Sequence, residues 1–126
     1  MPTIQFDDLI HQMLEHQSLQ TPDAIAITFE NQQLTYQELN NKANQVGHYL
    51  QALGVKPEAL VGVCIERSID MLVVLLGVLK AGGAYVPLDP SYPTDRIALM
   101  IEDSGIQITL TKQAQLANLP DRKSVV

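Results

Sequence analysis

Residues 60–88, LVGVCIERSIDMLVVLLGVLKAGGAYVPL, decide the fold that the chain can adopt. The run Leu60–Ile65 is apolar without alternation, which is typical of a strand buried on both faces. Residues Ile69–Ala81 are apolar on nearly every side of a helix, so other elements should cover this helix. Gly82-Gly83 can end the helix, and Ala84–Leu88 then predicts a second strand. The stretch therefore predicts a right-handed βαβ unit with parallel strands.

Capping residues define helices within this unit and on both sides of it. Ser68 can cap the central helix, while Thr94 can cap a later helix that Gly105 can end. Thr35 and Glu38 have the spacing of a capping box, in which each side chain accepts a hydrogen bond from a free backbone N–H. These signals predict where three helices begin or end.

Periodicity completes the assignment of elements. The apolar stripe from Leu39 to Leu53 recurs at spacings of three and four, which marks the inner face of a helix. Glu30-Asn31 can turn the chain between two short strands, with Asn31 tolerating the left-handed conformation. Alternating strands and helices predict an α/β fold with mostly parallel pairing. We expect helices over about Asp8–Gln17, Tyr36–Leu53 and Asp95–Asp103, strands over Ala24–Phe29, Gln32–Thr35 and Ile106–Leu110, and a short helical turn around Gln113–Leu119.

Composition and charge exclude several classes of protein. The 126 residues are 46% apolar and 17% charged, which suits one domain or part of one and argues against disorder. The net charge of −6 and the lack of a basic patch argue against nucleic acid, because phosphate contacts need Lys and Arg. The most apolar run, Met71–Leu79, is shorter than the roughly 20 residues of a membrane span. With one cysteine and no signal peptide between Met1 and Asp8, we expect a cytoplasmic protein.

Residues that could carry chemistry are few and scattered. The sequence has no phosphate loop, dinucleotide fingerprint or nucleophile elbow, and each of these needs glycines in a fixed pattern. His11, His16 and His48 could bind a metal only if they converged, and their spacing spreads them over different faces and elements. Cys64 lies in an apolar strand with no His or Lys close in sequence, so an inert core thiol is the better interpretation. We therefore assign no catalytic, cofactor-binding or metal-binding residue.

Two stretches resemble signature motifs of the adenylation domains of nonribosomal peptide synthetases. Leu34–Leu39, LTYQEL, resembles the first motif, and Leu79–Asp89, LKAGGAYVPLD, resembles the second. Their order and spacing also agree with this family, and the resemblance extends over about Leu9–Leu119. It implies part of the N-terminal subdomain of the adenylate-forming enzyme fold. Residues 1–126 would then be an incomplete adenylation domain, with 121–126 as an unstructured tail.

The resemblance also implies an activity for the parent enzyme. Members of the family use ATP and Mg²⁺ to convert an amino acid into an aminoacyl-adenylate, and then load the acyl group onto the phosphopantetheine of a carrier domain. The family's phosphate loop, adenine-stacking aromatic residue, ribose-binding aspartate and C-terminal lysine would all follow this stretch. No family catalytic residue can therefore be placed on this chain. We expect the chain alone to be inactive and to hold no cofactor.

Several interpretations of the chain remain open from the sequence. It can be a truncated fragment that catalyses no ATP–pyrophosphate exchange, or an interaction subunit that the remainder of the domain or a synthetase module completes. It can also be a stand-alone α/β module that binds a small ligand. A fragment of an acyl-CoA ligase-like enzyme is the alternative parent. The motifs at 34–39 and 84–89 favour the peptide synthetase branch.

Overall fold

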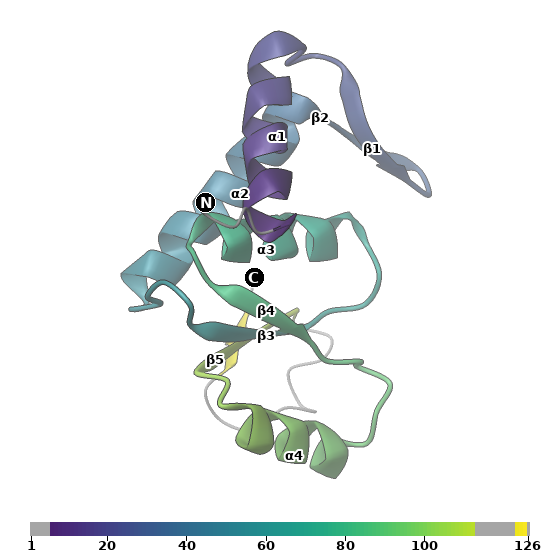
Figure 1. Ribbon diagram of the computed structural model, residues 1–126. Coiled ribbons are helices and arrows are strands. Elements are labelled where there is room, and N and C mark those ends of the chain that lie inside the picture. The colour runs from purple at the N-terminus through teal and green to yellow at the C-terminus, as the bar shows by residue number, and fades with distance from the viewer. Residues whose placement is uncertain (1–5, 113–122, 126) are drawn as a thin grey trace.

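The architecture is that of a computed structural model, which describes residues 6–112 and 123–125 (Figure 1). Strands and helices alternate from α2 to β5, as the sequence predicts. The helices are α1 (Phe6–Gln20), α2 (Tyr36–Ala52), α3 (Ile69–Lys80) and α4 (Thr94–Ser104). The strands are β1 (Ile25–Phe29), β2 (Gln32–Thr35), β3 (Leu60–Cys64), β4 (Ala84–Pro87), β5 (Ile108–Thr111) and β6 (Lys123–Val125).

A parallel sheet with the strand order β4-β3-β5-β6 lies at the centre of the fold. Val61 of β3 lies opposite Tyr85 of β4 on one side and opposite Ile108 of β5 on the other. α3 connects β3 to β4, and α4 connects β4 back across β3 to β5, so the direction of winding reverses after β4. Right-handed crossovers then place α3 and α4 on opposite faces of the sheet, as Figure 1 shows. The predicted α/β class and the parallel pairing of these strands are confirmed.

A second layer contains α1, the β1–β2 hairpin and α2, and it covers the outer side of α3 (Figure 1). β1 and β2 pair antiparallel, with Phe29 opposite Gln32. The left-handed residue of this turn is Glu30, with a φ of 55°, and not Asn31 as we predicted. The reason is the turn geometry, since a two-residue hairpin turn can require a positive φ at its first central position alone.

The predicted caps are confirmed at three helix ends. Thr35 Oγ1 accepts a hydrogen bond from the N–H of Glu38 at 3.1 Å, and Glu38 Oε1 accepts one from the N–H of Thr35 at 3.0 Å. Ser68 Oγ caps α3 by accepting a hydrogen bond from the N–H of Met71 at 3.1 Å. Gly105 ends α4 in the left-handed conformation, with a φ of 75°. Each of these arrangements involves residues that are close together in the sequence.

Three predictions at element ends need correction. Thr94 is the first residue of α4 and not its cap, because Pro93 takes the cap position without a side-chain hydrogen bond. Leu53 is 47% exposed, because α2 ends at Ala52 and Leu53 no longer follows the inner face of the helix. Lys123–Val125 forms β6 where we expected an unstructured tail over 121–126, because the edge of β5 offers unpaired backbone groups. The helical turn expected around Gln113–Leu119 lies outside the described residues.

Apolar side chains form three clusters between these layers. One joins the sheet to α3 and includes Val61, Val78 and Leu110, none of which is exposed. A second joins the other side of α3 to α1, the hairpin and α2. The third surrounds Ile97 of α4 on the opposite face of the sheet. Because α3 contributes to two clusters, its sequence is apolar on nearly every side.

Candidate functional site

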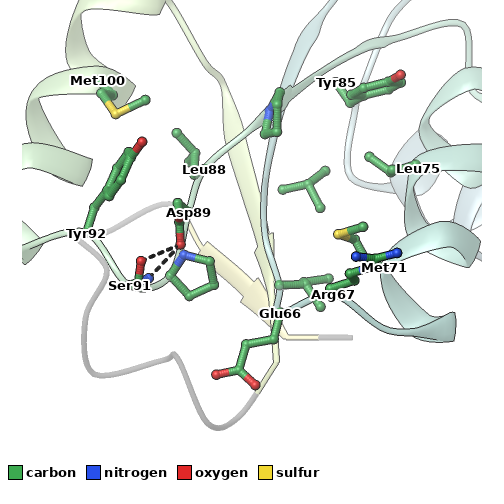
Figure 2. A pocket seen from close by; sticks show the side chains of 14 residues that line it. Glu66, Arg67, Met71, Leu75, Tyr85, Leu88, Asp89, Ser91, Tyr92 and Met100 are labelled. Carbon is green, nitrogen blue, oxygen red and sulfur yellow. Dashed lines mark hydrogen bonds between the residues drawn. The ribbon is translucent and has the colours of Figure 1, made fainter. Parts of the chain in front are cut away.

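A cavity of about 650 Å³ opens at the carboxyl ends of β3 and β4 (Figure 2). In a parallel sheet that winds in two directions, ligand sites commonly form at this edge of the strands. Met71, Leu75 and Tyr85 line one side of the cavity, and Tyr92 and Met100 line the other side (Figure 2). The first side belongs to the α3 face of the sheet and the second to the α4 face. The cavity is therefore a largely apolar groove at the end of the edge strand β4.

The loop between β4 and α4 forms one wall of the groove and is held by local hydrogen bonds. Asp89 Oδ1 accepts hydrogen bonds from the N–H of Ser91 at 2.9 Å and from its hydroxyl at 2.7 Å (Figure 2). These two bonds, the backbone one foremost, hold the pKa of Asp89 below its ordinary value. The Arg96 guanidinium lies 4.3 Å from the centre of the Tyr92 ring, an arrangement that favours a cation–π contact. The loop thus positions Tyr92 against the groove.

The polar groups around the groove do not converge on one point. The Glu66 side chain extends away from the side chains of both walls (Figure 2). Oδ1 of Asp89 accepts both of its hydrogen bonds from Ser91. Arg67 is exposed, and no described carboxylate lies within ion-pair distance of it. General acid–base or nucleophilic catalysis needs groups within hydrogen-bond reach of one another. Among the described residues of the groove, Ser91 and Asp89 are within that reach, and their hydrogen bond links residues two positions apart in the loop.

The residues considered from the sequence lie apart from one another. Cys64 is fully buried at the end of β3, and burial raises the pKa of its thiol, with a further contribution from the Asp89 carboxylate. His16 on α1 and His48 on α2 are exposed, while His11 belongs to α1 and its side chain lies outside the described part. Within residues 6–112 and 123–125, no group of three or more His, Cys, Asp or Glu could hold a metal ion.

Lys80 has a structural role that we did not predict from the sequence. Its side chain is only 6% exposed, and its Nζ lies 2.8 Å from Oε1 of Glu15, whose side chain is 51% exposed. The pair faces a small polar cavity of about 120 Å³, to which α2 contributes His48. Lys80 therefore ties α1 to the end of α3. Its place in the second motif was the one available signal, and its partner is 65 positions away in the sequence.

The described residues do not fit ATP and Mg²⁺. Phosphate groups need several free backbone N–H groups in a glycine-rich turn, or a cluster of cationic side chains. Of the groove residues only Arg67 is basic. Gly82 has a φ of 85° and follows the C-terminal end of α3, where the helix dipole disfavours anions. The helix-ending role predicted for Gly82 is confirmed.

No helix within the described residues combines the length and the apolar character needed to cross a membrane.

Comparison with known proteins places these features in a larger context. Residues 14–126 match the profile of the AMP-binding enzyme family. The chain is 54% identical to bacitracin synthase 3 of Bacillus licheniformis over 103 residues, which are 82% of this chain and 2% of that protein. It is 51% identical to gramicidin S synthase 2 of Brevibacillus brevis over 112 residues, which are 89% of this chain and 2% of that protein. The chain spans between 1% and 4% of the length of these and similar curated relatives.

Solved structures share the fold over nearly the whole chain. The nonribosomal peptide synthetase FmoA3, bound to α-methyl-L-serine-AMP, superposes with a TM-score of 0.86 at 36% identity. That match covers 94% of this chain and 14% of the FmoA3 chain. The N-terminal subdomain of Klebsiella oxytoca NpsA shares the fold at 22% identity, with a TM-score of 0.81 over 93% of this chain and 29% of that subdomain.

Proposed function

The chain belongs to the AMP-binding enzyme family and corresponds to the N-terminal part of a nonribosomal peptide synthetase adenylation domain, and from this we propose the activity of the complete domain. That domain activates an amino acid with ATP and Mg²⁺ as an aminoacyl-adenylate. It then loads the acyl group onto the phosphopantetheine of a carrier domain. The observation that carries the proposal is the family match over 14–126 together with the shared fold of FmoA3.

Within the complete domain, we assign this chain a scaffolding role. The lack of a convergent set of polar groups in the groove supports this assignment, because adenylation requires groups that hold phosphate and a divalent cation. The motif residues have structural partners instead. Thr35 and Glu38 cap α2, Lys80 pairs with Glu15, and Gly82 ends α3. The chain by itself should therefore hold no cofactor and catalyse no exchange.

The natural partner under this proposal is the remaining polypeptide of the adenylation domain, whether joined to this chain or supplied as a separate polypeptide. The small share of each matched synthetase that this chain spans supports such a partner. A cytoplasmic location is part of the same proposal. The free, buried Cys64 supports it, because unpaired thiols are compatible with a reducing compartment.

Amino-acid-dependent ATP–pyrophosphate exchange tests the proposed activity. In one experiment the chain replaces the matched segment of FmoA3, and exchange is measured with α-methyl-L-serine. We expect the chimera to retain exchange, since the replaced segment contributes a scaffold and no reacting group. The isolated chain, assayed in parallel, should show none. A folded chimera without exchange would contradict the proposed function, and exchange by the isolated chain would contradict the scaffolding role.

A further inference from the structure

The groove continues as an apolar surface around the end of β4. A second hollow of about 380 Å³ lies against Val86 and the outer side of α4, and it shares Met100 with the groove. Leu99 lines this second hollow and is 57% exposed. Apolar side chains from both faces of the sheet are thus exposed to solvent along the β4 edge. A contiguous apolar surface of this kind is a candidate for contact with another polypeptide.

The backbone of β4 limits the way in which a partner can bind there. The N–H groups of Ala84 and Leu88 donate to carbonyls of the β3 side, at 2.8 and 2.9 Å. In a parallel pair, alternate residues face the same neighbour, so Tyr85 and Pro87 present their backbone away from β3. Pro87 has no N–H, which is the usual position of proline in an edge strand. A further strand cannot form a full ladder on β4, so an occupant must bind mainly through side chains.

A small polar ligand does not suit this groove. Ligand sites combine an apolar wall with a few converging polar groups that fix orientation. Here the Glu66 side chain extends away, Oδ1 of Asp89 is bonded to Ser91, and the exposed Arg67 is the one basic residue of the described lining, so the polar groups do not converge (Figure 2). An apolar polypeptide segment needs no such anchor. The structure therefore favours a protein surface over a small molecule.

We infer that this groove binds apolar side chains of the polypeptide that follows the matched segment in the complete adenylation domain. The inference rests on the proposed function. The length of the relatives supports this occupant, because this chain matches only 29% of an N-terminal subdomain that shares its fold, so most of that subdomain lies outside the match. Because Pro87 interrupts the edge of β4, the inserted segment is a helix or loop and not an added strand.

A cysteine at Met71 reports on this contact. Met71 is partly buried on the α3 side of the groove, and Met71→Cys keeps a small apolar side chain with sulfur there. The native Cys64 is fully buried with a raised thiol pKa, so it should react slowly and leave a low background. Asn31→Cys is the matched control, because Asn31 is exposed in the β1–β2 turn, away from the groove.

Both variants are labelled with a maleimide, in the isolated chain and in the FmoA3 chimera, and each rate is read by mass spectrometry of the labelled peptide. We expect Met71→Cys to react about tenfold more slowly in the chimera, because a covered thiol is inaccessible to the reagent. Asn31→Cys should react at a similar rate in both proteins. If the chimera does not fold, the isolated chain is mixed with the rest of the FmoA3 adenylation domain as a second polypeptide, and the same comparison is made.

Equal reactivity of Met71→Cys in the isolated chain and in the folded chimera would overturn the inference. Protection in the isolated chain that grows with protein concentration would also overturn it, because a second copy would then cover the groove. Retained exchange with an unprotected thiol rejects only the inference. A protected thiol in a folded chimera that lacks exchange supports the inference and rejects the proposed function.

Discussion

The crossing of α2 and α3 leaves no room for a side chain at Gly77, and Gly77→Ala is the sharpest test of the packing. A Cβ at this position would lie 2.5 Å from Val46 Cβ and 3.1 Å from the carbonyl oxygen of Ala43. Carbon atoms prefer separations of about 3.5–4.0 Å, so the two helices would have to part by roughly 1 Å. Val46 packs against the clusters on both sides of α3, so both would be disturbed.

The expected magnitude comes from two opposing effects. Overpacking a well-packed core costs about 1–3 kcal/mol. An overlap with Val46 Cβ belongs at the upper end of that range, because this atom is bonded directly to the backbone of α2 and cannot move away without it. Replacing glycine by alanine inside a helix stabilises the folded state by about 1 kcal/mol through helix propensity. We therefore expect Gly77→Ala to lower the free energy of unfolding by about 2 kcal/mol, which is a fall in Tm of about 6–12 °C for a chain of this size.

Gly47→Ala is the matched control, because Gly47 lies in the same helix crossing and gains the same propensity. Its Cβ would lie 3.3 Å from the Gly77 carbonyl oxygen and 3.3 Å from Lys80 Cβ, distances that small shifts can relieve. Its free energy of unfolding should stay within about 1 kcal/mol of the wild type. Urea unfolding followed by circular dichroism measures both variants. A Gly77→Ala protein as stable as the wild type would refute the reasoning, since it would mean that the helices do not cross at this separation.

Four further predictions concern the ends of the helices and the ion pair between α1 and α3. Thr35→Ala should lower the free energy of unfolding by about 1 kcal/mol through loss of the α2 cap, and an unchanged urea midpoint would contradict this. The N–H of Thr35, and then its hydroxyl, hold the pKa of Glu38 below its ordinary value. The advantage of the wild type over Glu38→Gln should therefore be complete above about pH 4.3 and fade as the pH falls through the lowered pKa, and a pH series of urea midpoints checks it. Glu15→Gln should destabilise the chain more than Lys80→Met, because Glu15→Gln leaves the buried Lys80 ammonium without its counterion. Lys80→Met leaves only the half-exposed Glu15 carboxylate, which water can solvate. The opposite order of thermal midpoints would show that the pair is not buried as described. Gly105→Ala should cost about 1 kcal/mol because its φ of 75° is unfavourable for alanine, and thermal unfolding measures this loss.

Much of the fold could be predicted from the sequence because its signals are local. The βαβ unit over 60–88 follows from apolar runs and glycines, and the capping box of Thr35 and Glu38 depends on residues three positions apart. The two motifs also indicated the correct family. Element ends were less predictable. Thr94 is the first residue of α4 because Pro93 precedes it, and Leu53 is exposed because α2 ends one residue earlier.

Only the tertiary structure decided which distant residues meet. The order β4-β3-β5-β6 places α3 and α4 on opposite faces of the sheet, and this order creates the groove from two segments that are separate in the sequence. The ion pair of Lys80 and Glu15 joins residues 65 positions apart, and no sequence pattern around either residue predicts the other as its partner. Hydrophobic periodicity and capping motifs involve residues that are only a few positions apart in the chain. The sequence by itself therefore determined the elements and the family. Contacts between elements depend on strand order and helix crossing, and those follow from the joint packing of the whole core.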